Sequence, residues 1–464
     1  MTERIASGRF RRDMLWGLAA QGLSVAAGLI LLPAALRYLP NEQLGLWFVF
    51  ITLSSLVQLL ELGFQPTISR NVAYVYAGAQ QLVASGHAAN TSPGQLNPAL
   101  LQQLFFAARK VYRNIAALAA LAFLLPGTFY LLSLRPDNLP SSTLLWAWVT
   151  FALGYVFNFY YGYFNGFLQG RGQVTAANQV QVANRASMLI LGSLLLMLDW
   201  GLPGLGIASL FSCLISRVLA RHFFWQAPET QPLRQANTPD HNPLLAVLWH
   251  NASKLGWVSL GAFLINRANM LLASSLLGLG VAASYGLTLQ VLMTATAFAN
   301  VALGLKLPQI SASHIHGQAH HARHHFAVAL IAGWLIYGGS ALLLLWLGND
   351  LLHLLGSKTH LLAPLELALL AAILLLELNH SLFATYLTTL NQVPFVKAAL
   401  LSGMAIVSGG LLSIQWLGWG LLGMISAQGL VQLAYNNWQW PRLALRQMQC
   451  SLGQLLSQGL HPLR

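Results

Sequence analysis

Long apolar runs, rather than alternating apolar and polar positions, dominate the sequence. Each run holds about 20 mostly apolar residues, which is enough for one helix to cross the hydrocarbon core of a membrane. We expect such spans near residues 14–36, 45–66, 111–134, 144–168, 175–198, 203–224, 248–277, 281–306, 326–348, 361–389, 394–417 and 419–440. The pattern therefore predicts an all-α integral membrane protein with about 12 transmembrane helices.

Two polar segments between the runs are longer than the others, at about 71–108 and 225–247. The second contains "WQAPETQPLRQANTPDHN", and its proline and polar residues are typical of a linker. Six spans lie on each side of it. We therefore expect four parts: an N-terminal six-helix bundle over 1–225, a cytoplasmic linker over 226–247, a C-terminal six-helix bundle over 248–440 and a cytoplasmic tail over 441–464.

The two halves also resemble each other. "LPNEQLGLW" (39–47) joins the first two spans, and "LGVAASYGL" (279–287) joins the seventh and eighth. Likewise, "GRGQVTAAN" (170–178) precedes the fifth span and "TLNQVPFVK" (389–397) precedes the eleventh. Because each half has an even number of spans, both run in the same direction. This indicates two parallel bundles related by an axis along the membrane normal, as in some transporters.

Composition excludes an ordinary soluble domain, and the placement of charge gives the orientation. The 464 residues are 56% hydrophobic and 8% charged, whereas soluble domains contain about 25% charged residues. Most of the 24 Lys and Arg residues fall on one side of the membrane, and the expected other side has only Arg37, Arg135 and Lys358. The positive-inside rule then places both termini in the cytoplasm. The net charge of +13 follows from this topology and needs no nucleic-acid partner.

Several segments resemble a known family. The turn "LPNEQLGLW", the end of the second span "LLELGFQPTISR" (59–70) and "FNGFLQGRGQVTAANQ" (164–179) are similar to Wzx-type polysaccharide flippases. These belong to the multidrug/oligosaccharidyl-lipid/polysaccharide (MOP) exporter superfamily, which also contains MATE-like multidrug exporters. The resemblance covers nearly the whole chain and rests on pattern and spacing.

The resemblance implies a fold and a function. Such proteins move undecaprenyl-pyrophosphate-linked oligosaccharides from the inner to the outer leaflet of the bacterial inner membrane. They work by alternating access, commonly coupled to a proton or sodium gradient, beside other polysaccharide-assembly membrane proteins. The resemblance implies no cofactor. One departure is that Glu61, the acidic residue of the second span, has no counterpart in "ALGLK" (302–306).

Two arginines lie in the middle of apolar spans. Arg267 stands in "GAFLINRANMLLAS" (261–274) between Asn266 and Asn269, and Arg185 lies about ten residues into the fifth span. A charge at the centre of a helix costs about 2.5–3.5 kcal/mol on insertion scales and usually faces a cavity or a partner. Guanidinium is suited to phosphate. We therefore expect these four residues to bind the pyrophosphate headgroup; the alternative is a structural ion pair with a carboxylate.

Three carboxylates also lie within spans and are candidates for ion coupling. Glu61 is in the second span, and Glu366 and Glu377 share one face of the tenth, with His380 one turn beyond Glu377. A buried carboxyl can take up a proton near neutral pH, and histidine titrates there natively. Glu377 and His380 could therefore form a proton relay. Salt bridges to the two arginines, or a helix end in water for Glu366, are the alternatives.

The fourth span contains polar residues three to four positions apart. Asn158, Tyr161, Asn165 and Gln169 would share one face of a regular helix. Amides and aromatic rings bind sugars, so we expect the first three to contact the glycan. Hydrogen bonds between helices explain the same pattern equally well.

The segment "HIHGQAHHARHH" (314–325) holds six of the 14 histidines. Its irregular spacing, without cysteine or carboxylate, favours a solvated basic cytoplasmic loop over a metal site.

Other functions were weighed against a flippase. The sequence has no phosphate-binding loop, nucleophile elbow or paired metal motif, so we expect no enzymatic activity. A membrane glycan polymerase would need a larger external loop. A MATE-like multidrug exporter would favour carboxylates in its cavity because its substrates are cationic, and this sequence has both carboxylates and arginines.

Overall fold

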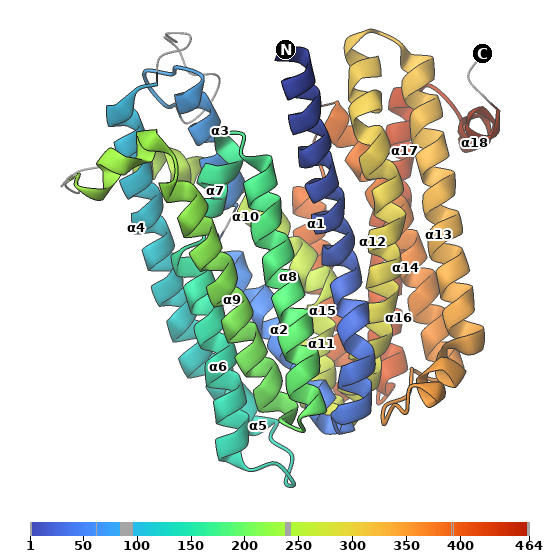
Figure 1. Cartoon of the computed structure of the whole chain (residues 1–464). Coiled ribbons are helices and arrows are strands. Elements are labelled where there is room, and N and C mark those ends of the chain that lie inside the picture. The colour runs from blue at the N-terminus through green and yellow to red at the C-terminus, as the bar shows by residue number, and fades with distance from the viewer. Residues whose placement is uncertain are drawn as a thin grey trace. The chain divides into compact units, whose positions relative to one another are not determined.

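The computed structural model describes residues 2–61, 63–83, 96–236, 243–390, 392 and 394–461, and every secondary-structure element in these ranges is a helix (Figure 1). Part of the predicted linker, residues 237–242, and the last three residues of the predicted tail lie outside them. Ten of the described helices are long and apolar enough to cross a membrane, and one bent pair, Gly256–Asn266 with Ala268–Leu277, makes an eleventh. The chain is therefore an all-helical, multi-pass membrane protein.

The internal contacts divide the chain into two compact units, which we describe separately. Unit 1 comprises Met1–Leu39 and Phe50–Leu260, and unit 2 comprises Pro40–Val49 and Gly261–Arg464. The first turns of α2 therefore group with unit 2. Most of α10 groups with unit 1.

Unit 1 is built from helices α1 to α9 and the start of α10. Its elements are α1 (Thr2–Tyr38), α2 (Asn41–Gln58) from Phe50 onward, η1 (Leu59–Glu61), α3 (Phe64–Tyr76), α4 (Pro98–Ala122), η2 (Phe123–Gly127), α5 (Thr128–Ser133), α6 (Ser141–Tyr160), α7 (Tyr163–Gly170), α8 (Val174–Met197), α9 (Gly201–Trp225), η3 (Pro228–Arg234) and α10 (Leu244–Asn266). Buried aromatic rings fill its interior: Trp148 is fully buried and contacts Phe50, Phe123 and Phe151.

Unit 2 begins near the end of α10. Its elements are the first turns of α2, α11 (Ala268–Leu272), η4 (Ala273–Leu277), α12 (Leu279–Ile315), α13 (Ala319–Leu354), α14 (Pro364–Thr389), α15 (Val396–Gln415), α16 (Gly420–Ala434), α17 (Asn436–Met448) and α18 (Leu452–Leu460).

The two units repeat the same packing order, as the similar sequence segments predict. In unit 1, α9 packs against α6 and α8, and α8 packs against α1. In unit 2, α16 packs against α14 and α15, and α15 packs against α11. Corresponding helices therefore have corresponding neighbours in the two halves of the chain.

The twelfth predicted span, 419–440, is split, which corrects the prediction of one continuous helix. α16 has 15 residues, and Tyr435 leaves helical geometry (φ −145°, ψ −61°) before α17 begins. Hydrogen bonds stabilise the chain at this break, because Asn436 donates to Ser402 and Gln432 at 2.8 and 2.6 Å. α16 still crosses unit 2. It starts near the end of α15 and leads into α17. Gln447 of α17 donates a hydrogen bond to Gln392, which lies just before the start of α15.

Hydrogen bonds from the motif "GRGQ" (170–173) and from Tyr76 connect the end of α9 and the start of the predicted linker to the rest of unit 1. Arg171 donates to the carbonyls of Phe223 and Phe224 at 2.7 and 3.2 Å, so its positive charge meets the negative end of the α9 dipole. Tyr76 donates to Glu229 of η3 at 3.1 Å. Burial, together with the neighbouring Glu229 carboxylate, raises the pKa of Tyr76 to about 12.

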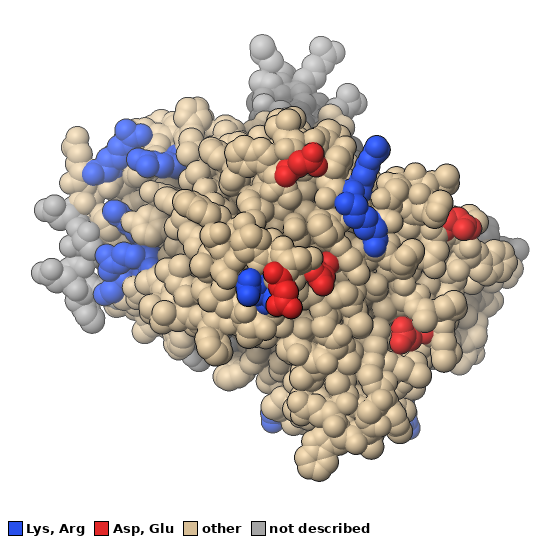
Figure 2. All heavy atoms as spheres, turned by 90° about the horizontal axis from the view of Figure 1, so that it is seen from below, with Lys and Arg blue, Asp and Glu red and all other residues tan. Residues whose placement is uncertain are grey.

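Three acidic residues stand at the ends of helices or in the connections between them. Asp137 lies between α5 and α6, Asp199 between α8 and α9, and Glu366 in the first turn of α14. Figure 2 shows that acidic and basic side chains are few among the uncharged side chains visible in that view.

Candidate functional site

Besides the twelfth, three predicted spans are interrupted, and each of these three interruptions holds a residue that the sequence analysis marked as a site residue. The second span stops after Glu61 and resumes as α3 beyond Gly63, whose φ of 78° is left-handed. The fourth span stops at Tyr161 (φ −104°), and the seventh stops at Arg267 with a bend of 47°. Irregular backbone at membrane depth is tolerated where it is buried in protein or lines a polar cavity, so these interruptions are candidate sites.

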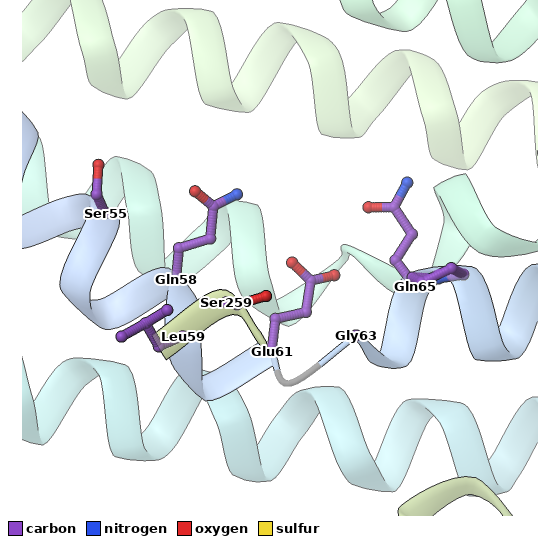
Figure 3. Close-up of a pocket in the computed structure, with 8 residues that line it drawn as sticks. Ser55, Gln58, Leu59, Glu61, Gly63, Gln65 and Ser259 are labelled. Atoms are coloured by element: carbon purple, nitrogen blue, oxygen red, sulfur yellow. The ribbon is translucent and has the colours of Figure 1, made fainter. Parts of the chain in front are cut away.

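A pocket of about 270 Å³ opens at the interruption of the second span in unit 1. Glu61 lies in its wall, and Gln58, Gln65, Ser55 and Ser259 provide further polar side chains. Figure 3 shows the side chains of Gln58, Glu61 and Gln65 pointing to the same side of the chain. The pocket can therefore donate and accept several hydrogen bonds next to one carboxylate.

Glu61 also joins a buried polar cluster. The hydroxyl of Tyr112 in α4 donates to Glu61 Oε1 at 2.5 Å, and the charge of Arg217 in α9 interacts with the same carboxylate. Arg217 Nε donates to Asn158 Oδ1 at 2.8 Å, and its Nη1 is buried without a hydrogen-bond partner. Arg217 therefore lies inside unit 1, where its charge interacts with Glu61.

The polar stripe predicted on the fourth span is not continuous, because the chain leaves helical geometry at Tyr161 between α6 and α7. Asn158 accepts a hydrogen bond from Arg217. Tyr161 packs in parallel with Phe164 at a ring-centroid distance of 6.1 Å. Asn165 Oδ1 is buried without a hydrogen-bond partner. The three predicted glycan contacts therefore have different surroundings.

Arg185 lies in the middle of α8 and is exposed. Its charge interacts with Tyr155 and Cys213 of unit 1. No carboxylate among the described residues pairs with it, so the structure gives it no ion-pair partner.

Arg267 occupies the bend of the seventh span, between α10 and α11, and is half-buried. Its charge interacts with Tyr285 of α12, and none of the described carboxylates is bonded to its guanidinium. Asn266 donates back to Ala262 of its own helix at 3.0 Å. The guanidinium is therefore left available to another anion.

Glu377 of α14 lies in unit 2 and is 9% exposed. Two neutral amides of α16 donate to its Oε1: Gln428 at 2.8 Å and Gln432 at 3.4 Å. Each amide is in turn held by another donor, because Asn269 donates to Gln428 at 2.9 Å and Asn436 donates to Gln432 at 2.6 Å. Two chains of hydrogen bonds, one through Gln428 and one through Gln432, therefore end at the carboxylate. We call these five residues the Glu377 network.

The Glu377 network reaches the bend at Arg267. Asn269 lies two residues beyond Arg267, and Tyr285 of α12 interacts with both of them. The network therefore connects the buried carboxylate to the interrupted span through neutral side chains.

His380 and Glu366 do not join Glu377. His380 Nδ1 is bonded to Asn437 Oδ1 of α17 at 2.8 Å, so the expected relay pair has separate partners. Glu366 lies in the first turn of α14, about 16 Å from Glu377 along the helix axis. There its charge meets the positive end of the helix dipole, which agrees with the alternative of a helix end.

Sequence reasoning missed the partners of the carboxylates. Gln428, Gln432 and Asn436 recur every four residues in an otherwise apolar segment, which places them on one helical face. This spacing is the signal that could have found them. Tyr112 and Tyr285 gave no comparable signal, since buried aromatic residues are common in such bundles.

The fold is similar to those of solved multidrug transporters. The inward-facing conformation of a multidrug resistance MATE family transporter of the MOP superfamily has a TM-score of 0.66 to this chain. The two are 13% identical, and the match covers 92% of this chain and 95% of that one. This chain has the MATE transporter fold. A MATE in complex with MaL6 gives a TM-score of 0.56 at 13% identity, over 94% of this chain and 96% of that one.

The outward-facing conformation of a multidrug resistance MATE family transporter gives a TM-score of 0.55 at 12% identity, over 94% of both chains. No protein-family model matches the sequence, and no curated protein matches it. At these identities the MATE likeness defines the fold, and the substrate has to be argued from the residues.

Proposed function

We propose that the protein is a transporter that flips a polyprenyl-pyrophosphate-linked oligosaccharide from the inner to the outer leaflet of the bacterial inner membrane. The MATE fold supports a transporter of the MOP superfamily. The observation on which the substrate class rests is Arg267, a half-buried guanidinium at the bend of a membrane span that no described carboxylate neutralises.

The arginines support an anionic headgroup. Guanidinium stays charged at physiological pH and forms paired hydrogen bonds with phosphate oxygens. Arg267 offers such a group in unit 2, and exposed Arg185 offers one in unit 1. Asn269, in the Glu377 network, is the part of this site that would respond to the coupling ion.

Ion coupling is assigned to Glu377, with Glu61 as the second candidate. Glu377 lies in a buried network of neutral donors, so a proton or a sodium ion that reaches it changes the charge of the whole network. His380 and Glu366 are less suited to this role, because each has surroundings separate from Glu377.

The pocket beside Glu61 supports a place for the glycan. Sugar hydroxyls both donate and accept hydrogen bonds, and amide side chains such as those of Gln58 and Gln65 can do both in return. Asn158, Tyr161 and Asn165 lie in the same unit and remain candidates for glycan contact.

A MATE-like multidrug exporter is the second candidate function. The pocket itself favours it, since a half-buried carboxylate in a cavity wall suits a cationic drug. The two functions predict opposite residue requirements: a flippase needs Arg267, and an exporter of cations needs Glu61.

The test is complementation of a strain that lacks the gene. We expect lipid-linked glycan to accumulate on the cytoplasmic leaflet and wild type to relieve it. Arg267→Ala should fail at normal membrane abundance, Arg267→Lys should restore part of the activity, and Arg70→Ala, at an exposed position of α3, should behave as wild type. Unchanged glycan with raised sensitivity to cationic drugs, dependent on Glu61, would establish the exporter instead.

A further inference from the structure

The C-terminal helix α18 packs against the beginning of α13 in unit 2. Leu455 is fully buried, and Gly459 approaches so closely that a Cβ there would lie 2.9 Å from Ala327 Cβ. His324 Nδ1 is bonded to the Gln458 carbonyl at 2.7 Å. In Figure 1, α18 is seen nearly end-on beside the upright α13, so its axis lies across the bundle axis.

α18 is an amphipathic helix with apolar residues left uncovered. Leu452 is 41% and Leu460 is 72% exposed, although Leu455 between them is buried. A capping box, in which Ser451 and Gln454 bond each other's backbone, fixes the start of the helix. A short helix that lies across the bundle and exposes leucines has the geometry of a helix in the membrane interface.

Arg323 and several histidines lie at the beginning of α13, the helix against which α18 packs. The histidines expected in a loop extend into the first turns of α13, where His320 and His321 are exposed. Arg323 Nη1 donates to the Met448 carbonyl at 2.9 Å, whereas its Nε is buried without a hydrogen-bond partner.

The sequence supplies no negative charge to balance them. No Asp or Glu occurs in residues 300–349, which contain the histidine-rich segment, or in 378–464, which contain α17 and α18. A metal ion does not explain the histidines, because no group of three or more His, Cys, Asp or Glu among the described residues is placed to hold one.

We propose that the start of α13 and α18 together form a binding surface for anionic phospholipid headgroups. The exposed leucines of α18 enter the acyl-chain boundary, and the exposed imidazoles of α13 bind the headgroup phosphates. A lipid fits better than a soluble anion, because it alone satisfies the apolar and the cationic parts together. This surface is independent of the transport site at Arg267.

The test measures lipid binding by the purified full-length protein in neutral detergent. Fluorescent phosphatidylglycerol and phosphatidylcholine are the probes. The variant His320→Ala/His321→Ala removes two exposed imidazoles of α13. Its matched control, His353→Ala/His360→Ala, removes two exposed imidazoles at and beyond the opposite end of the same helix. A third variant, Leu460→Ser, removes exposed apolar surface from α18.

We expect wild type and the control to prefer phosphatidylglycerol. The His320/His321 variant should lose affinity for phosphatidylglycerol and bind phosphatidylcholine as wild type does, and Leu460→Ser should weaken the binding of both lipids. Equal binding of the two lipids by wild type, or the same loss in the control as in the His320/His321 variant, would overturn the proposal. Size-exclusion profiles identify any variant that misfolds. We expect all variants to fold, because the substituted side chains are exposed.

Discussion

Every side chain that the structure shows donating to Glu377 belongs to a neutral amide. A neutral amide stabilises a carboxylate less than a guanidinium does. When the carboxyl group carries a proton, that proton needs an acceptor, whereas the amide N–H groups that face it are donors. At the scale of single residues, the hydrogen bonds of the Glu377 network are therefore all formed only while Glu377 accepts and the amides donate.

We predict that Gln428→Leu destabilises unit 2 by about 1–3 kcal/mol, because it removes the shorter bond to a buried carboxylate and leaves Asn269 without its acceptor. Thermal unfolding of the purified protein measures the effect. The control is Gln415→Leu, at an exposed position near the end of α15, which should change stability by less than about 0.5 kcal/mol. Equal effects in both variants would contradict the importance of the network.

Glu61 and Arg217 give a second residue-scale prediction. Because their charges interact inside unit 1, the effects of Glu61→Gln and Arg217→Gln on unfolding free energy should not add. We expect a coupling of about 0.5–3 kcal/mol in a double-mutant cycle. Arg221, one turn further along α9 and exposed, provides the comparison cycle with Glu61, which should be additive within about 0.5 kcal/mol.

Helix interruptions are the feature that matters at the scale of elements. The predicted spans fall on helices, but the sequence analysis treated the second, fourth, seventh and twelfth as continuous, because hydrophobicity is the same on both sides of each interruption. Gly63 and Gly162 gave a weak signal for the first two of these interruptions, and neither glycine nor proline marks those at Arg267 and Tyr435. The bend at Arg267 depends on tertiary packing, which periodicity does not record.

We predict that Gly63→Ala costs about 1–2 kcal/mol of stability, since φ at this position is 78° and a Cβ is strained there. The pocket beside Glu61 should lose its shape in the same variant, because Gly63 lies in its wall. Gly304→Ala in α12 is the control: open space surrounds that position, and alanine should stabilise the helix by up to about 1 kcal/mol. The comparison uses denaturation midpoints, and a neutral Gly63→Ala would refute the argument.

The whole molecule was the most predictable level. A membrane leaves only helices that satisfy their own backbone, so apolar run length gave the all-helical fold almost directly. Arg267 and Glu377 were visible because a charge in an apolar run is conspicuous. Gln428 was missed because a neutral amide is not conspicuous. The charge interaction of Arg217 with Glu61 was missed because the two residues lie on elements far apart in the sequence.

Topology provides the prediction at this scale. If α16 crosses the membrane, both termini lie on the cytoplasmic side, as the distribution of Lys and Arg indicates. A green fluorescent protein fused after residue 464 should then fluoresce, and an alkaline phosphatase fused there should be inactive. The control fusion sites are the connections near residues 136 and 357, where the reporters should behave in the opposite way. An active phosphatase at the C-terminus would mean that α16 does not cross.

The short α16 also affects the lipid around the protein. Fifteen residues extend about 22 Å, whereas the hydrocarbon core is about 30 Å thick. Leu430 and Leu433 of this helix are exposed, so acyl chains can reach it. A hydrophobic mismatch of this size is accommodated by local thinning of the bilayer. We expect a dimple in the membrane beside α16, and a polar headgroup that passes there has a shorter apolar distance to travel.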